Sequence, residues 1–285
     1  MPSIGLVDIQ EKYNSLKEYL LSCQKVLIAY SGGVDSVFLL KVATDTLGPQ
    51  NVIACLGTSP SLGKSQHAQA LEMAEIIGAP LREIPVTELD DPNYSANKAD
   101  RCFHCKSHLY GIFTKIAKQE GIEHVLCGAN LDDKDDYRPG NRAAEVFKVK
   151  SPLIDAGLTK NDIRQLSKEL NLKTADLPAA PCLASRITYG LEVTEERLNQ
   201  IDQAEDYLKS LGLQTLRVRH HGDTARIEVP TQDINKITEE NTRKKIVDRL
   251  KQIGFKYISL DLQGFRSGAL NETLTEQQKR SEQAR

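Results

Sequence analysis

Residues 25–47, KVLIAYSGGVDSVFLLKVATDTL, decide the fold of this chain. KVLIAY is an apolar, β-rich run typical of a buried strand, and residues 36–47 show helical spacing that ends before Gly48 and Pro49. A glycine turn separates the two. Further strands are expected at 51–57, 81–86 and 124–127, and further helices at 64–77 and 107–118. Strands that alternate with helices predict an α/β fold with a doubly wound parallel sheet.

The pattern changes after residue 177. The proline-punctuated loop PAAPCLASR precedes a helix expected over 195–211, the alternating strands LQTLRVRH and TARIEV, and the run KYISLDL. This is an α+β pattern, which favours a second, smaller domain. We therefore expect three parts: residues 1–180 as the sheet domain, 181–272 as a small α+β domain, and 273–285 as a polar tail.

Composition excludes several classes of protein. The chain has 285 residues, with 40% hydrophobic and 27% charged residues, a balance that is typical of globular domains. No apolar run approaches the roughly 18 residues of a membrane span, and acidic side chains among the first twenty residues argue against a signal peptide. A cytoplasmic protein without membrane contact is predicted. The net charge of −2 argues against nucleic acid as the main partner.

The turn SGGVDS, residues 31–36, has the composition of an anion site. Gly32 and Gly33 allow close backbone approach, the helix N-terminus offers N–H groups, and Ser31 and Ser36 add hydroxyl donors. Asp35 suits a metal ion that bridges phosphates. No GK[ST] follows, so a Walker lysine is missing. An ordinary serine-capped turn is the alternative, but SGGVDS resembles the PP-loop of ATP pyrophosphatases, which bind the leaving pyrophosphate of ATP.

A second loop, GANLDDKDDYRPG at residues 128–140, follows the strand expected at 124–127. It resembles the nucleotide-side loop of the same enzymes. Gly128 would let adenine or ribose approach the strand end, and Arg138 could meet a phosphate. Four carboxylates are available for Mg²⁺: Asp132, Asp133, Asp135 and Asp136. Alternatively, these acids are simply solvated.

Cysteine placement points to a sulfur or metal site. Three of the six cysteines lie in apolar runs or have no evident partner: Cys23, Cys55 and Cys127. Cys102 and Cys105 form a C-x-x-C placed before the expected helix, and Cys182 lies in the PAAPCLASR loop. Three thiolates leave one open position on zinc, or one open iron on a four-iron cluster, and Arg101 and Lys106 would stabilise them. The alternative is an unrelated pair with one stray cysteine.

Arginines cluster in the second part of the chain. Ser185 and Arg186 close the Cys182 loop, and Arg217 and Arg219 stand two apart on a strand, so both side chains point to one face. Such a pair suits bidentate binding of a phosphate. A solvated strand face is the other interpretation.

The motifs together resemble one family over nearly the whole chain. SGGVDS, DDYRPG, PCLASR, LRVRHHGDTARIEV and YISLDLQGFRSG, in this order, look like the LarE family. Its members are pyridinium-3,5-bisthiocarboxylate mononucleotide synthases, ATP-dependent sulfur transferases that make the precursor of the nickel-pincer cofactor of lactate racemase. The resemblance implies that residues 1–180 are a PP-loop ATP pyrophosphatase domain and that residues 181–272 serve substrate binding and oligomerisation.

The resemblance also implies ligands and partners. ATP and Mg²⁺ would bind at residues 31–36 and Gly128, with Asp35 and Asp132 near the metal. The phosphate of the small-molecule substrate, a pyridinium mononucleotide, would lie near four residues: Ser185, Arg186, Arg217 and Arg219. A homo-oligomer, usually a hexamer, and a downstream nickel-insertion protein are further implied partners.

Two sulfur routes stay open. Some members carry a single cysteine on the loop matching Cys182, which surrenders its sulfur and becomes dehydroalanine. Others hold a [4Fe-4S] cluster on three cysteines. The additional Cys102 and Cys105 favour the cluster, and sulfur would then leave from its open iron.

Three rival functions remain. A PP-loop tRNA thiolase would also use three cysteines, but the net charge of −2 argues against RNA binding. An amide-forming synthetase of the NAD or GMP type leaves the cysteines unexplained. A non-catalytic nucleotide sensor with a zinc-clipped loop would release no pyrophosphate from ATP.

Overall fold

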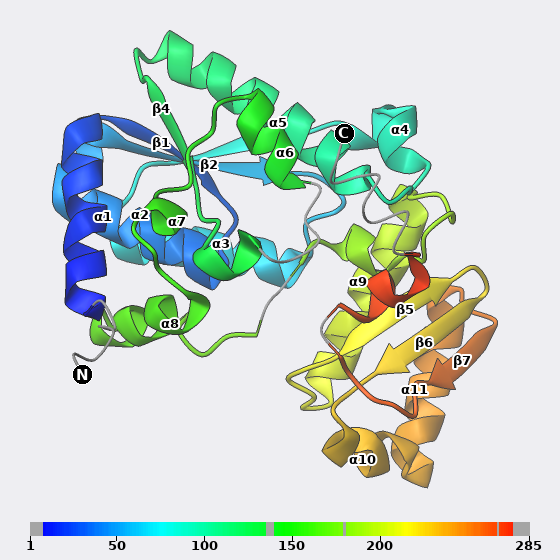
Figure 1. Cartoon of the computed structure of the whole chain (residues 1–285). Coiled ribbons are helices and arrows are strands. Elements are labelled where there is room, and N and C mark those ends of the chain that lie inside the picture. Colours follow the sequence, from blue (N-terminus) through cyan, green and yellow to red (C-terminus); the bar gives the residue numbers. More distant parts are fainter. Residues whose placement is uncertain (1–7, 135–139, 179–180, 267, 276–285) are drawn as a thin grey trace. The chain divides into compact units, whose positions relative to one another are not determined.

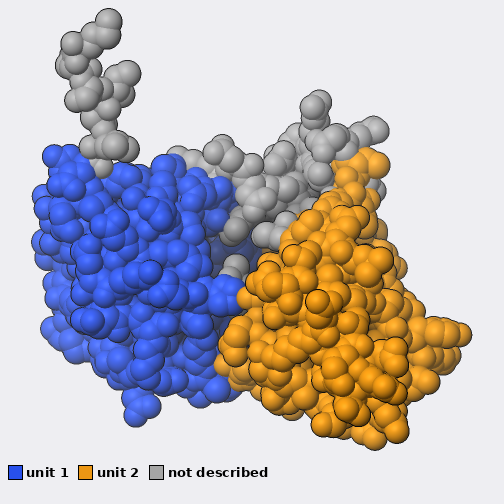
Figure 2. Space-filling model, turned by 90° about the horizontal axis from the view of Figure 1, so that it is seen from below, with its two compact units in different colours: residues 1–58, 66–86, 103–180 blue, residues 59–65, 87–102, 181–285 orange. Residues whose placement is uncertain are grey.

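The computed structural model describes residues 8–134, 140–178, 181–266 and 268–275 (Figure 1). They form two compact units, coloured separately in Figure 2. Unit 1 contains the described residues of 1–58, 66–86 and 103–180, and unit 2 those of 59–65, 87–102 and 181–285. The expected functional division at residue 180, with a tail from residue 273, stays a prediction.

Unit 1 is built on a parallel sheet with the strand order β3-β2-β1-β4. The strands are β1 (Val26–Tyr30), β2 (Val52–Thr58), β3 (Leu81–Pro85) and β4 (His124–Cys127). Val26 stands beside Val52 on one side and His124 on the other, so β1 is central. This arrangement confirms the predicted α/β class, and it places the turn after β1 next to the end of β4.

Helices cover both faces of this sheet (Figure 1). They are α1 (Ile9–Cys23), α2 (Val34–Leu47), α3 (Lys64–Ile77), α5 (Arg101–Gln119), α6 (Gly140–Val146), α7 (Pro152–Asp155) and α8 (Lys160–Glu169). On one face, Tyr110 and Phe113 of α5 pack with Ala143 of α6 against Leu27 and Cys55. On the other face, α2 contacts β1, β2, α1 and α8. Within the described residues, no helix is both long and apolar enough to cross a bilayer.

The helix expected over 107–118 begins six residues earlier, at Arg101. Cys102 and Cys105 therefore lie inside the first turns of α5, not before it, which corrects the sequence-based placement. The Arg101 amide donates to Lys98 O at 3.0 Å and starts the helix. Cysteine, phenylalanine and histidine are mediocre helix formers, so the sequence hides this turn. As a consequence, the two thiols are three residues apart on one helix face.

Unit 2 carries a small mixed sheet in the order β5-β6-β7. Strands β5 (Arg217–His221) and β6 (Thr224–Glu228) form a hairpin through Gly222, and β7 (Tyr257–Leu260) runs parallel to β6. The helices are α4 (Pro92–Ser95), α9 (Glu195–Ser210), α10 (Ile234–Thr238) and α11 (Glu240–Ile253). Their core includes Leu208, Val218 and Leu250. The predicted small α+β domain is confirmed as a fold, although β5 begins four residues later than expected.

Six short 3₁₀ helices complete the described structure. They are η1 (Pro49–Asn51), η2 (Glu88–Asp90), η3 (Leu131–Lys134), η4 (Leu183–Arg186), η5 (Thr231–Asp233) and η6 (Ala269–Thr273). Three of them, η2, η3 and η4, lie in the loops that follow β3, β4 and Cys182. The predicted loops therefore contain local helical turns, which fix the direction of the side chains that they carry.

The end of β4 approaches the start of α2 very closely at Gly128. A Cβ atom there would lie 2.9 Å from Ser36 N and 3.0 Å from Ser36 Cα. Both are backbone atoms of a helix, which cannot swing aside as the end of a side chain can. Glycine is therefore required for packing, independently of any ligand that approaches the strand end.

We expect Gly128→Ala to lower the free energy of unfolding by about 1–3 kcal/mol, as other overpacked sites do. Gly111→Ala is the matched control. Gly111 lies inside helix α5, and a Cβ atom there would lie 3.4 Å from the nearest atom of the Phe147 ring, a side chain that can adjust. There alanine should stabilise by about 0.5–1 kcal/mol through helix propensity. Urea unfolding of both variants measures the difference, and equal effects would contradict the steric explanation.

Candidate functional site

The SGGVDS turn is closed by its own serines. Ser31 N donates to Ser36 Oγ at 3.2 Å, the two hydroxyl oxygens are 3.0 Å apart, and Ser36 Oγ donates to Gly33 O at 3.1 Å. Gly32 has φ +71°, and a Cβ there would lie 2.6 Å from Ala70 Cβ, so no other residue fits. Gly33 is the N-cap of α2 and has no side chain to accept from the first N–H groups. These N–H groups and the helix dipole suit an anionic ligand.

Lysine 160 joins this turn from a distant part of the sequence. Its Nζ lies 2.6 Å from Asp35 Oδ2, and its backbone N donates to Asp132 Oδ2 at 2.9 Å. Lys160 is the first residue of α8, behind a capping box formed by Thr159 and Asp162. The structure therefore brings Asp35 and Asp132 around one lysine. Sequence reasoning missed Lys160, since its only signal was the capping box.

The remaining acids of the 128–140 loop have different positions. Asp133 is buried and its Oδ2 accepts from Asn130 N at 3.1 Å, so this carboxylate holds the loop. Gly128 packs against α2, as described above. Asp135, Asp136 and Arg138 lie outside the described residues. Oxygen donors from Asp35 and Asp132 are of the kind that Mg²⁺ prefers, so the donor chemistry at this turn fits that ion.

Cys102 and Cys182 share one electrostatic environment in unit 2. Arg101 interacts with both thiols, and Cys102 acts in turn on Cys182. Burial raises the pKa of the Cys182 thiol, whereas the guanidinium groups of Arg101 and Arg186 oppose that rise. Cys105 follows one helical turn after Cys102 in α5.

The other three cysteines are buried: Cys23, Cys55 and Cys127. Burial raises the pKa of Cys55 to about 11, as expected for a thiol that only fills space. Cys102, Cys105 and Cys182 are all partly exposed residues, which suits metal-binding thiols, although burial of the Cys182 thiol means that a metal ion or a nearby cation must favour its thiolate. Within the part of the chain that is described, no three His, Cys, Asp or Glu side chains are already gathered around one metal position. Thiolate donors nevertheless fit an iron–sulfur cluster by their chemistry.

Arg186 holds the Cys182 loop. It is 3% exposed, and its Nε and Nη2 donate to the two carboxylate oxygens of Glu205 at 3.0 and 3.1 Å. Its Nη1 donates to Pro181 O, to Cys182 O at 3.0 Å and to Ser185 Oγ at 3.0 Å. Most of its donors are therefore engaged within the protein, and this arginine fixes the loop in place.

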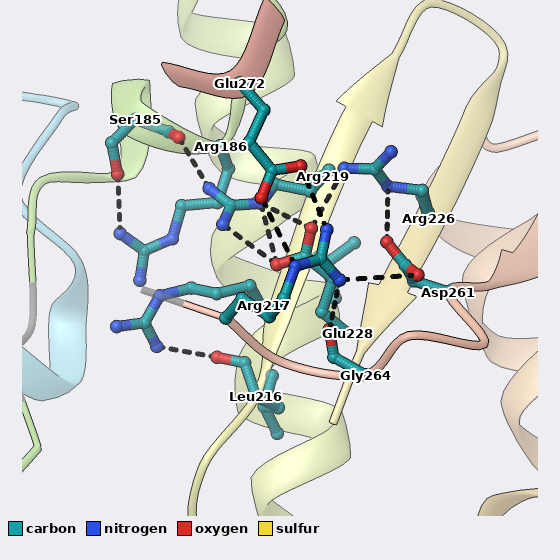
Figure 3. A network of polar contacts seen from close by, with 12 residues as sticks. Ser185, Arg186, Leu216, Arg217, Arg219, Arg226, Glu228, Asp261, Gly264 and Glu272 are labelled. Carbon is teal, nitrogen blue, oxygen red and sulfur yellow. Dashed lines mark hydrogen bonds and ion pairs between the residues drawn. The ribbon is translucent and has the colours of Figure 1, made fainter. Parts of the chain in front are cut away.

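Arg219 is held in the same way (Figure 3). Its Nε and Nη2 donate to Glu228, which is 0% exposed, at 2.9–3.0 Å, and its Nη1 donates to Ser185 O at 2.9 Å. Arg226 also reaches Glu228, at 2.9 Å. The predicted strand arginines are thus buried, which contradicts the interpretation as a solvated face.

Arg217 experiences crowded positive charge. It donates to Leu216 O at 2.6 Å and its guanidinium lies 5.3 Å from the centre of the Phe265 ring. Burial, followed by repulsion from Arg186, lowers its pKa to about 10. An anion placed beside Arg217 would relieve this repulsion. The structure brings Ser185, Arg186, Arg217 and Arg219 together in unit 2 (Figure 3).

Comparison with known proteins decides the family. Residues 8–104 match the family model described as NAD synthase. The chain is 40% identical over 267 residues to an uncharacterized protein of Synechocystis sp., covering 94% of this chain and 99% of that protein. It is 37% identical over 273 residues to the pyridinium-3,5-bisthiocarboxylic acid mononucleotide synthase of Lactiplantibacillus plantarum, covering 96% and 98%. This chain belongs to the LarE family. The resemblance inferred from the motifs is thereby confirmed.

The similarity to the LarE relative extends over both units, and therefore over both sheets. The NAD synthase match ends at residue 104, so it includes the SGGVDS turn and Arg101 but excludes Cys105, Cys182 and the arginines that follow Cys182. The LarE relative covers both units. The chain is therefore an enzyme of the NAD synthase-like PP-loop group, and most of its second unit lies beyond the NAD synthase match.

We expect Arg219→Met to lower the free energy of unfolding by about 3–5 kcal/mol, because it breaks a buried ion pair and leaves Glu228 with Arg226 alone. Arg217→Met is the matched control on the same strand face. It removes charge repulsion, so its loss should be much smaller. Denaturant unfolding at neutral pH measures both, and equal losses would show that Arg219 has no special structural role.

Proposed function

We propose that this LarE-family chain is an ATP-dependent sulfur transferase. It converts the carboxylates of pyridinium-3,5-biscarboxylic acid mononucleotide into thiocarboxylates, in the biosynthesis of the nickel-pincer nucleotide. The observation that carries the proposal is the 37% identity to the named Lactiplantibacillus plantarum synthase across 96% of this chain. The geometry of both units supports it, as follows.

The SGGVDS turn is the proposed ATP site. Its closed shape directs the first N–H groups of α2 toward a pyrophosphate group, and Lys160 supplies the positive charge that a Walker lysine provides elsewhere. Asp35 and Asp132 would hold Mg²⁺, which neutralises charge on phosphate oxygens when it is bound. Lys160 pairs with Asp35 at this turn. On binding, ATP would exchange this pair for contacts with phosphate and metal.

Activation by ATP solves a chemical problem. A carboxylate is a poor electrophile, because resonance and negative charge both repel a sulfur nucleophile. When a substrate carboxylate oxygen attacks the α-phosphorus of ATP, pyrophosphate leaves and an acyl-adenylate forms. Sulfur then attacks the acyl carbon, AMP departs, and a thiocarboxylate remains. Backbone N–H groups of the turn stabilise the charge on the leaving pyrophosphate.

The arginines of unit 2 are the proposed site for the substrate phosphate. The positive charge of Arg217 is repelled by the neighbouring guanidinium groups of Arg186 and Arg219. Ser185 is hydrogen-bonded to both of these neighbours. Arg186 and Arg219 already form ion pairs with glutamates. They would therefore contribute positive electrostatic potential and a fixed geometry to the site rather than direct bonds to the phosphate. We assign direct phosphate binding to Arg217, because an anion beside it would relieve the repulsion from Arg186 that helps to lower its pKa.

Sulfur is proposed to reach the substrate through Cys102, Cys105 and Cys182. Bound to these three thiolates, a [4Fe-4S] cluster would supply sulfide at its fourth iron. The alternative is a sacrificial Cys182, whose Sγ attacks the acyl carbon and whose Cβ–S bond then breaks with loss of the Cα proton. Three partly exposed thiols, two of them around Arg101, support the cluster route.

The rival functions explain less. An amide-forming synthetase agrees with the NAD synthase match over residues 8–104 but gives no role to the cysteines. A tRNA thiolase and a zinc-clipped nucleotide sensor leave the similarity to the named synthase unexplained. We further propose a cytoplasmic homo-oligomer, a hexamer by family resemblance, that hands its product to a nickel-insertion protein. Residues 1–180 would bind ATP and residues 181–272 the substrate.

The test of the function is pyrophosphate release with ATP, Mg²⁺ and the pyridinium biscarboxylate mononucleotide. Wild-type protein should release pyrophosphate without RNA or ammonia, and Asp35→Asn should fold normally but lose about 10²-fold or more of the rate, since the metal-holding charge is gone. Asp45→Asn is the control, because Asp45 lies on the same helix in an exposed pair with Lys41. Unchanged release by Asp35→Asn would refute the ATP assignment.

The sulfur route has its own test. Single Cys→Ala changes at 102, 105 and 182 should each lower the iron content of anaerobically purified protein and abolish multiple turnover. Cys55→Ala should change neither, because this thiol is buried in the core. A chain lighter by one H₂S at position 182 after reaction, with Cys102→Ala still active, would instead establish the sacrificial route.

A further inference from the structure

Arg101 differs from the other buried arginines of unit 2. Its side chain is 2% exposed, as deeply buried as Arg186 and Arg219. Those two arginines are neutralised by Glu205 and Glu228. Among the described residues, no carboxylate forms an ion pair with Arg101. Its hydrogen bonds go instead to two neutral acceptors, the Asn97 side-chain oxygen and Ala184 O, the latter at 2.9 Å.

A buried cation without a carboxylate is costly unless another anion lies near it. The ionisable groups that interact with Arg101 are two cysteines and two tyrosines: Cys102, Cys182, Tyr94 and Tyr189. Tyr189 presents its ring, 5.9 Å from the guanidinium. A cysteine bound to a metal is a thiolate, so Cys102 and Cys182 become anions when they act as ligands. Arg101 is thus placed where thiolates at Cys102 and Cys182 would compensate its charge.

The contacts of Arg101 also hold together the two chain segments that carry Cys102 and Cys182. Arg101 begins α5 beside Cys102, and its Nη1 reaches Ala184, two residues after Cys182. Asn97, which accepts from the same Nη1, donates to Thr188 O at 2.8 Å and to Leu191 O at 2.7 Å. One side chain therefore links the first turn of α5 to the Cys182 loop.

We propose that Arg101 is a positioning residue and the counter-cation of the sulfur centre formed by Cys102 and Cys182. It holds the two cysteine segments together and stabilises the negative charge that the centre carries. This inference rests on the sulfur role proposed above. It predicts that removing the charge makes a bound cluster harder to reduce, because reduction adds another negative charge beside the vacated site.

The test compares Arg101→Gln, which keeps a donor but loses the charge, with Arg101→Lys, which keeps the charge. Arg164→Met is the control for loop clipping, since Arg164 donates to Ala175 O and Leu177 O but lies by no cysteine pair. Each protein is purified anaerobically, and the reduction potential is measured by a redox titration followed by electron paramagnetic resonance. Iron content and sulfur transfer are measured in parallel.

We expect R101Q to be about tenfold harder to reduce, a shift of about 59 mV for one electron, with R101K and R164M close to wild type. If R101Q does not fold, Y189E replaces it, because a carboxylate in place of the ring that lies 5.9 Å from the guanidinium would cancel the same charge and leave the hydrogen bonds of Asn97 in place. A potential of R101Q or Y189E equal to wild type would overturn the role of Arg101. Wild-type protein that transfers sulfur without binding iron would overturn this inference alone, whereas wild-type protein that transfers no sulfur would overturn the proposed function as well.

Discussion

The ion pair between Arg186 and Glu205 is the interaction on which unit 2 depends. Glu205 comes from α9, Arg186 closes the Cys182 loop, and Glu205 also accepts from Val218 N of β5 at 3.0 Å. Three segments are therefore joined at one buried carboxylate. Burial would raise the pKa of Glu205, but Arg186 and the neighbouring donors lower it below its usual value. The pair is thus fully charged at neutral pH, and its contribution to stability is lost only as the pH falls through that lowered pKa.

Buried ion pairs of this kind fix the positions of side chains more than they increase the free energy of unfolding. Replacing a complete buried pair by apolar side chains is often neutral, whereas removing one partner costs about 3–5 kcal/mol. Arg186–Glu205 and Arg219–Glu228 hold the Cys182 loop and the strand arginines in fixed positions before any ligand binds. A site prepared in this way loses less conformational entropy on binding, which is how a rigid site gains affinity for a small anion. In the proposed phosphate site, Arg217 would therefore need no change in the loops around it.

Local signals allowed much of unit 1 to be predicted. Residues 25–47 contain a strand, a turn and a helix in order, so the hydrophobic pattern and the glycines of this run are enough to predict them. The helix at 64–77 was predicted with both ends correct. The predicted start of α5 was wrong, because the helix begins with the hydrogen bond from the Arg101 amide to Lys98 O rather than with residues of high helix propensity. Lys160 was missed because it stands 125 residues from Asp35, and only the fold brings them together. The glutamates that pair with Arg186 and Arg219 were invisible for the same reason.

The motifs of unit 2 each combine two physical roles. In PCLASR, Arg186 holds the loop that presents Cys182 and Ser185. In the strand motif, Arg219 is fixed by Glu228 while Arg217 carries the crowded charge. In QGFR, Gly264 adopts φ +76° with Val229 O only 2.9 Å from where a Cβ would stand, and this turn directs Phe265 toward Arg217. A residue that binds and a residue that positions it are thus neighbours in sequence, so the linear motif alone cannot separate them. Hydrogen-bond partners and charge together separate them: Arg186 and Arg219 donate to buried glutamates and hold the fold, whereas Arg217 has its pKa lowered by burial and by the repulsion of Arg186.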